Sequence, residues 1–135
     1  MDFMAGLRES FGLEEVDIRT YSPLVLAYIG DVVYELVIRS LLVGKGNAQV
    51  NRLHRRASSL VNAAAQSAAF ERIREELTGE ELHVFRRGRN ANSATMAKHA
   101  TMTDYRRATG FEALMGYLYL TGQTERIYTL VRLAF

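Results

Sequence analysis

The sequence contains no cysteine and no tryptophan, and it has a single proline among 135 residues. The lack of cysteine excludes disulfide bonds and thiolate metal sites, and it fits a reducing cytoplasm. No segment alternates apolar and polar residues for long enough to predict a β-strand. The first ten residues lack the basic start and apolar run of a secretory signal, so we expect none. These absences favour an all-α protein located in the cytoplasm.

A long uninterrupted apolar run is also missing. Residues 22–43 (SPLVLAYIGDVVYELVIRSLLV) are numerous enough to cross a bilayer as a helix, but Asp31, Glu35 and Arg39 interrupt them. Each of these charges would be costly in lipid, so we expect no membrane partner. Apolar residues occupy nearly all sides of the predicted helix, which indicates the buried central helix of a domain.

Local signals predict about six helices in one domain that covers residues 1–135. Ser22 is a good N-cap for the central helix, Pro23 suits its first position, and Gly44 and Gly46 end it. Asn47 is then a candidate N-cap for the next helix. With 48% apolar residues, the chain is long enough for a single core. The predicted helices cover residues 2–11, 22–43, 48–77 (with a possible division near 58–62), 79–88, 104–120 and 123–134.

The net charge of +2 is unevenly distributed. Residues 1–44 hold 3 basic and 7 acidic side chains, whereas residues 45–111 hold 12 basic and 6 acidic ones. A basic middle segment is a candidate surface for binding a polyanion. Within it, residues 89–101 are poor in core-forming side chains, and we expect them to form an exposed, mobile basic loop. An ordinary solvated face rich in arginine would explain the same composition.

Two carboxylates fall where the core is expected. Asp31 follows Gly30 in the central helix, and Glu112 lies in the fifth helix with Ala108 and Gly116 one turn away on either side. We expect these small residues to leave open space around the two carboxylates. If these helices cross, the two acids face each other, and one of them would tend to become protonated. A hard divalent cation between them would remove this repulsion, and Mg²⁺ needs only one or two protein carboxylates. The pattern alone supports equally well an arginine partner for each acid.

Three stretches resemble a known family. YIGDVVYELVI (residues 28–38) resembles the signature helix of the ribonuclease III family, and ATGFEALMGYLYL (residues 108–120) resembles its second acidic motif. Between them lies RRGRNANSAT (residues 86–95), and no double-stranded-RNA-binding domain follows. Together these features resemble the small subgroup called Mini-ribonuclease III, over nearly the whole chain.

The resemblance implies an all-helical, Mg²⁺-dependent endonuclease domain that acts as a homodimer on double-stranded RNA. For the subgroup it implies maturation of precursor 23S (large-subunit) ribosomal RNA, with ribosomal proteins or a pre-ribosomal particle as further candidate partners. It places the family's catalytic, metal-binding aspartate and glutamate on Asp31 and Glu112. Two more acids that the family usually has fall on Ala27 and Thr109 and are missing here. What is left is a two-carboxylate, water-rich Mg²⁺ site.

The basic segment is the candidate RNA-binding surface, because proteins recognise A-form RNA mostly through its phosphates and 2′-hydroxyls. Two rival hypotheses stay open beside the endonuclease. One is a non-catalytic RNA-binding or ribosome-associated protein on the same fold, which the missing acids motivate. The other, more remote, is a different helical metallohydrolase, for which no His–Asp ligand pair is evident. The candidate RNA-binding residues are Arg86, Arg87, Arg89, Asn90, Lys98, Arg106, Arg107, Arg55 and Arg56.

Overall fold

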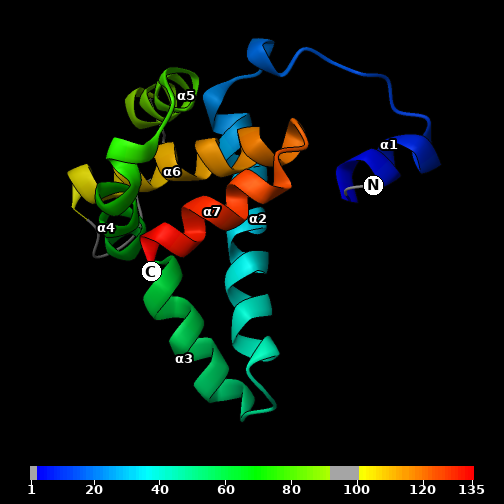
Figure 1. Cartoon of the computed structure of the whole chain (residues 1–135). Coiled ribbons are helices and arrows are strands. Elements are labelled where there is room, and N and C mark those ends of the chain that lie inside the picture. The colour runs from blue at the N-terminus through cyan, green and yellow to red at the C-terminus, as the bar shows by residue number, and fades with distance from the viewer. Residues whose placement is uncertain (1–2, 92–100) are drawn as a thin grey trace.

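The computed structural model describes residues 3–91 and 101–135. Over these residues the chain forms seven α-helices and two 3-10 turns and no strand (Figure 1). The all-α fold class is therefore confirmed. The helices are α1 (Phe3–Phe11), α2 (Pro23–Gly44), α3 (Val50–Val61), α4 (Ala63–Ile73), α5 (Gly79–Asn90), α6 (Met102–Leu120) and α7 (Thr124–Ala134), with 3-10 turns at Ile18–Thr20 and Arg74–Glu76.

Helix α2 has the ends that the sequence predicts. The Ser22 side chain accepts a hydrogen bond of 3.2 Å from the Leu24 N–H, and Pro23 is the first helical residue. The helix ends at Gly44, and Gly46 follows with a φ of 131° that glycine adopts readily. Helix α2 packs against α6, α3 and α5, so its central position is also confirmed.

The other helix boundaries differ in detail from the prediction. The chain has seven helices instead of about six because the predicted helix over residues 48–77 is divided into α3 and α4. The division is at Asn62, whose side chain accepts a 2.8 Å hydrogen bond from the Ala65 N–H. Asn47 is not an N-cap, since α3 begins only after Gln49. Helix α5 runs to Asn90, two residues beyond the predicted helix end at residue 88, so it includes the first two residues of the predicted loop over 89–101. Residues 92–100 of that predicted loop lie outside the part of the chain that the structure describes.

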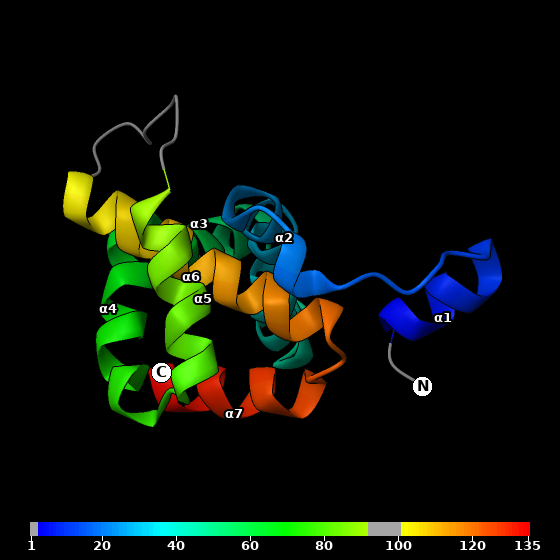
Figure 2. The same ribbon diagram turned by 90° about the horizontal axis from the view of Figure 1, so that it is seen from above.

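The remaining helices surround the crossing of α2 and α6. Helices α4 and α5 lie beside α6 on one side, and α7 covers another side of the core (Figure 2). Tyr34 of α2 is fully buried, with its ring edge-on to Phe111 of α6 at 5.0 Å and its hydroxyl donating to the Leu60 carbonyl at 2.8 Å. Helix α1 lies at the edge of this body in both views (Figures 1 and 2). None of its side chains is buried, and the Arg8 guanidinium donates to the Leu120 carbonyl of α6 at 3.5 Å.

The backbones of α2 and α6 touch where they cross. A Cβ atom added to Gly30 would lie 1.6 Å from the Glu112 carbonyl oxygen, and one added to Gly116 would lie 2.0 Å from the Leu26 carbonyl oxygen. The sequence suggested that small residues leave open space around the two carboxylates. The structure corrects this, because the backbone of the opposite helix fills the space at both glycines.

One face of α2 is exposed in the single chain. Tyr28 is 79% exposed, Val32 60% and Leu36 62%, at helical spacings of four residues. The prediction that the helix is buried on nearly all sides therefore holds on one side only. No helix within residues 3–91 and 101–135 has both the length and the apolarity that a membrane span requires.

Candidate active site

Asp31 and Glu112 lie together at the helix crossing. Because the α2 backbone at Gly30 touches the α6 backbone at Glu112, the next residue of α2 is placed beside the Glu112 side chain. The Asp31 carboxylate is close enough to form a hydrogen bond with that of Glu112. Glu112 is half-buried, whereas Asp31 is exposed, so the expectation that both acids lie in the core is wrong for Asp31. The structure thus brings together the two acids that the sequence singles out.

The Glu112 carboxyl group is held in its protonated form. Burial, together with the hydrogen bond and the negative charge of Asp31, raises its pKa to about 8, while a hydrogen bond from Gln66 opposes the shift. Near neutral pH the pair therefore holds a proton in the metal-free protein. A divalent cation that binds to the two carboxylates would displace this proton into solvent.

No basic side chain neutralises this pair within residues 3–91 and 101–135. The ion pairs there join other acids to arginines, as in Asp17 with Arg19 and Glu81 with Arg126. Among the described residues neither Asp31 nor Glu112 forms an ion pair with an arginine, so the alternative of an arginine partner for each acid is wrong there. Glu35, one turn after Asp31, pairs instead with Arg39 at 2.7 Å.

Gln66 of α4 is a site residue that the sequence analysis missed. Its side chain is buried, with 2% exposed, and its Nε2 donates to the Val61 carbonyl at 2.8 Å and to Glu112 Oε2 at 3.3 Å. Its Oε1 is buried without a hydrogen-bond partner among the described residues. The available signal was the polar pair Gln66 and Ser67 inside the alanine-rich run AAAQSAA.

The donor set suits a hard divalent cation that keeps much of its water. It offers two carboxylates, and the described part of the chain has no cluster of three or more His, Cys, Asp or Glu side chains. The two positions where the resemblance would place further acids hold an apolar and a neutral residue: Ala27 and Thr109 are both buried, and the Thr109 hydroxyl donates to the Tyr105 carbonyl at 3.1 Å. Mg²⁺ accepts this arrangement, since it binds through one or two carboxylates and several waters.

Some of the candidate RNA-binding arginines have structural partners. The Arg87 guanidinium donates to the Tyr21 carbonyl at 3.1 Å, and that of Arg107 forms a 2.9 Å ion pair with Glu71. The Arg89 guanidinium lies over the Phe85 ring at 5.9 Å. These contacts fix the side chains of Arg87 and Arg107 within the fold, so they are weaker candidates for phosphate contact than the sequence suggested.

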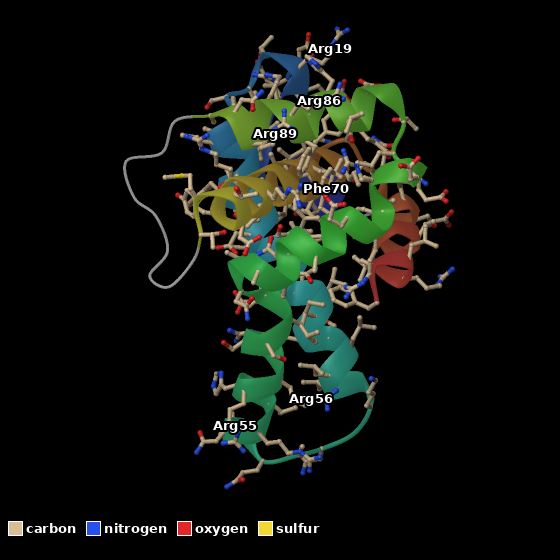
Figure 3. All side chains as sticks on the ribbon, turned by 90° about the vertical axis from the view of Figure 1, so that its left-hand side faces the viewer. Arg19, Arg55, Arg56, Phe70, Arg86 and Arg89 are labelled. Atoms are coloured by element: carbon tan, nitrogen blue, oxygen red, sulfur yellow. The ribbon has the colours of Figure 1, made fainter. Side chains whose placement is uncertain are left out.

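The exposed candidates fall into two separate groups. Arg86 and Asn90 are exposed on α5, and Arg106 is exposed on α6. Arg55 and Arg56 are exposed on α3, at the opposite end of the molecule from Arg86 and Arg89 (Figure 3). The remaining candidate, Lys98, lies outside the described residues. A single chain therefore does not present all the predicted cations on one surface.

Comparisons with known proteins place this arrangement among ribonucleases. A family model described as "Ribonuclease III domain" matches residues 24–123, which include both acids. A protein named Mini-ribonuclease 3 from Clostridium tetani is 48% identical, over 87% of this chain and 78% of its own. Its namesake from Thermoanaerobacter is 46% identical, over 97% of this chain and 92% of its own. The crystal structure of protein FN1578 from Fusobacterium nucleatum has a TM-score of 0.82 at 32% identity, over 90% of this chain and 98% of that one.

Proposed function

Because this chain belongs to the ribonuclease III family, in its Mini-ribonuclease III subgroup, and is an endoribonuclease, we propose that Asp31 and Glu112 are its catalytic, metal-binding residues. The proposed cofactor is Mg²⁺ and the proposed substrate is double-stranded RNA. The proposed role is maturation of precursor 23S ribosomal RNA in the cytoplasm. The observation that carries this proposal is the meeting of the two acids, without a basic partner among the described residues, at the crossing of α2 and α6.

The chemistry follows from the positions of the two acids. A bound divalent cation would lower the pKa of a water and stabilise charge that grows on the phosphate. Asp31 and Glu112 would hold that cation through anionic oxygens. Because Asp31 is exposed, its side of the site is open to a phosphate that approaches from solvent. Because burial and Asp31 raise the pKa of Glu112, this carboxyl group must lose its proton before it can bind the cation.

We expect cation binding to strengthen as the pH rises from about 6 to about 8. The raised pKa of Glu112, about 8, means that near pH 6 the cation must displace a proton from the site. A single displaced proton raises the apparent affinity by up to about tenfold per pH unit, and the gain ends above the raised pKa. Titration with Mg²⁺ at several pH values, followed by the rise in unfolding temperature, measures this.

Without the cation, the stability of the folded protein should fall as the pH rises, whereas cation affinity should increase. A folded-state pKa above the ordinary value of 4.5 contributes stability that is full at low pH and is lost as pH rises towards about 8. Metal-free protein should therefore become less stable over this range, by no more than a few kcal/mol, and Mg²⁺ should restore the loss. In the Glu112→Gln variant both pH dependences should be absent. A Mg²⁺ effect of equal size at both ends of the pH range would contradict this assignment.

A homodimer is part of the proposal. Tyr28, Val32 and Leu36 form an exposed apolar face on α2, the same helix that carries Asp31. Burying such a face between two copies is favourable and would create a two-fold axis beside the two sites. Two sites related by a two-fold axis match the two strands of an RNA duplex. A dimer would also increase the number of basic surfaces that one duplex can reach.

The exposed arginines should set RNA affinity through phosphate contacts. Replacing Arg86 and Arg106 together by alanine should weaken binding to duplex RNA about equally for different sequences, and it should reduce the salt dependence of binding. The same double replacement at Arg55 and Arg56 tests the second group. Arg72→Ala on α4 is the control, since Arg72 is exposed and belongs to neither group. Wild-type affinity that does not change between low and moderate salt would exclude phosphate contact as the main source of binding.

A divalent-dependent cleavage assay tests the proposed function directly. Wild-type protein is incubated with duplex RNA and with single-stranded RNA of the same sequence, with Mg²⁺ or with a chelator. We expect cleavage of the duplex only, in the presence of Mg²⁺ only. The second candidate, a non-catalytic RNA-binding protein, is motivated by the neutral residues at Ala27 and Thr109. Binding of duplex RNA without cleavage under any divalent condition would favour that candidate, alone or with a ribosomal partner.

A further inference from the structure

Resting on the proposed nuclease function, we propose that Gln66 is the positioning residue of this site. Its Nε2 would orient the Glu112 carboxylate for the cation, and its Oε1 would accept a hydrogen bond from a water that arrives with the cation. Gln66 comes from α4, whereas the two acids come from α2 and α6. The site would therefore be held by three helices rather than two.

The orientation of the Gln66 amide follows from its partners. The Val61 carbonyl and the Glu112 carboxyl group both face Nε2, at 2.8 Å and 3.3 Å. Only the NH₂ end of an amide can donate to two acceptors, so this end must point towards them. The Val61 carbonyl is at the end of α3, so the side chain also ties the junction of α3 and α4 to the site.

The other end of the amide points to a ligand. Oε1 is buried and has no donor among the described residues. Leaving a buried acceptor unpaired lowers stability, so an apolar side chain of similar shape would serve packing alone at least as well. Water is the donor available to a buried acceptor beside two carboxylates, and a hydrated divalent cation brings water to such a place. Gln66 thus has both a donor for the acid and an acceptor for a water.

A structural role and a positioning role predict different outcomes for Gln66→Met. This change keeps the length and apolar stem and removes both amide groups. If Gln66 only fills space or joins helices, unfolding temperature is the quantity that changes, and cation binding stays as in the wild type. If Gln66 positions Glu112, stability changes little, whereas cation affinity and kcat both fall by about 10- to 100-fold, the usual effect of losing a hydrogen bond to a metal ligand. KM for duplex RNA should stay close to the wild-type value.

The experiment combines two readouts on the whole protein. Isothermal titration with Mg²⁺ or Mn²⁺ alone, without RNA, gives cation affinity, and steady-state cleavage over a range of duplex RNA concentrations gives kcat and KM. Gln49→Met is the matched control, since Gln49 is exposed and its side chain makes no cap hydrogen bond. Gln66→Asn is the second variant, because its amide is one methylene too short to reach Glu112 and it keeps a polar group in the pocket. The same measurements on Gln66→Asn replace those on Gln66→Met if the latter does not fold.

Each outcome decides a different point. Loss of cation affinity in a folded Gln66→Met or Gln66→Asn variant, with Gln49→Met unchanged, supports the proposal. Wild-type cation affinity and kcat in a folded Gln66 variant overturn it, even while Asp31→Asn abolishes both. If Asp31→Asn leaves cation binding and cleavage unchanged, the proposed function itself fails. The two failures are thus distinguished by the same set of proteins.

Discussion

Asp31→Asn and Glu112→Gln should each reduce single-turnover cleavage of duplex RNA by more than about 10³-fold. Each change keeps the shape of the side chain and removes the charge that would hold the cation. Because the phosphate contacts are expected from arginines elsewhere, the affinity for duplex RNA at low salt should stay within about threefold of the wild-type value. Cleavage of an end-labelled duplex and a gel-shift titration with Ca²⁺ in place of Mg²⁺ measure the two quantities separately.

The same two variants, which should lose cleavage, should not lose stability. Above about pH 8, where both acids of the metal-free protein are ionised, Glu112 and Asp31 repel each other, so replacing either carboxylate by its amide should there leave the fold as stable as before or more stable. Glu75→Gln is the control, since Glu75 is an exposed acid in the second 3-10 turn. A variant that gains stability and loses cleavage identifies a functional site. If both variants still cleave at the wild-type rate, the two acids are not the catalytic pair.

Local features of the sequence were sufficient to predict α2 and the two acids. Ser22 and Pro23 mark the start of the helix because capping and the missing N–H of proline act within one turn. Asp31 and Glu112 stand out because a carboxylate inside an apolar helical pattern needs a special environment. Such signals depend on neighbouring residues only, and a single sequence contains them in full.

Features that depend on how helices pack could not be read in this way. The exposed face at Tyr28 and Val32 has the same apolar composition as the buried face of α2, so composition alone does not separate core from interface. Arg106 and Arg107 are neighbours in the sequence, yet Arg107 pairs with Glu71 on α4 whereas Arg106 is exposed. Gln66 reaches Glu112 only because α4 packs against α6. In each case the deciding partner lies on another helix.

The two glycines of the crossing connect the fold to the proposed chemistry. Gly30 and Gly116 allow the backbones of α2 and α6 to touch, and this contact sets the distance between the Asp31 and Glu112 side chains. The two acids repel each other whenever both are ionised, so they cannot by themselves keep the site together once the shared proton is lost. Packing energy of the two helices therefore holds the carboxylates together until a cation binds.

Gly30→Ala should consequently destabilise the protein by more than about 3 kcal/mol, a large part of the stability of a small domain. The added methyl group would lie 1.6 Å from the Glu112 carbonyl oxygen, which belongs to a backbone and has no rotamer to change. Relief requires α2 and α6 to separate, and this separation moves Asp31 away from Glu112. Denaturant unfolding measures the loss of stability, and cleavage by the remaining folded fraction measures the loss of the site.

Gly44→Ala distinguishes this effect from the general cost of changing a helical glycine. Gly44 is the last residue of the same helix, and a Cβ atom there would have nothing within 4 Å. Alanine at this position should change stability by less than about 1 kcal/mol and leave cleavage intact, because alanine favours the helix and meets no obstacle. Equal losses of stability in both variants would mean that helix propensity, and not the contact of α2 with α6, explains Gly30. A stable, active Gly30→Ala protein would show that close contact of the two backbones is not what brings the acids together.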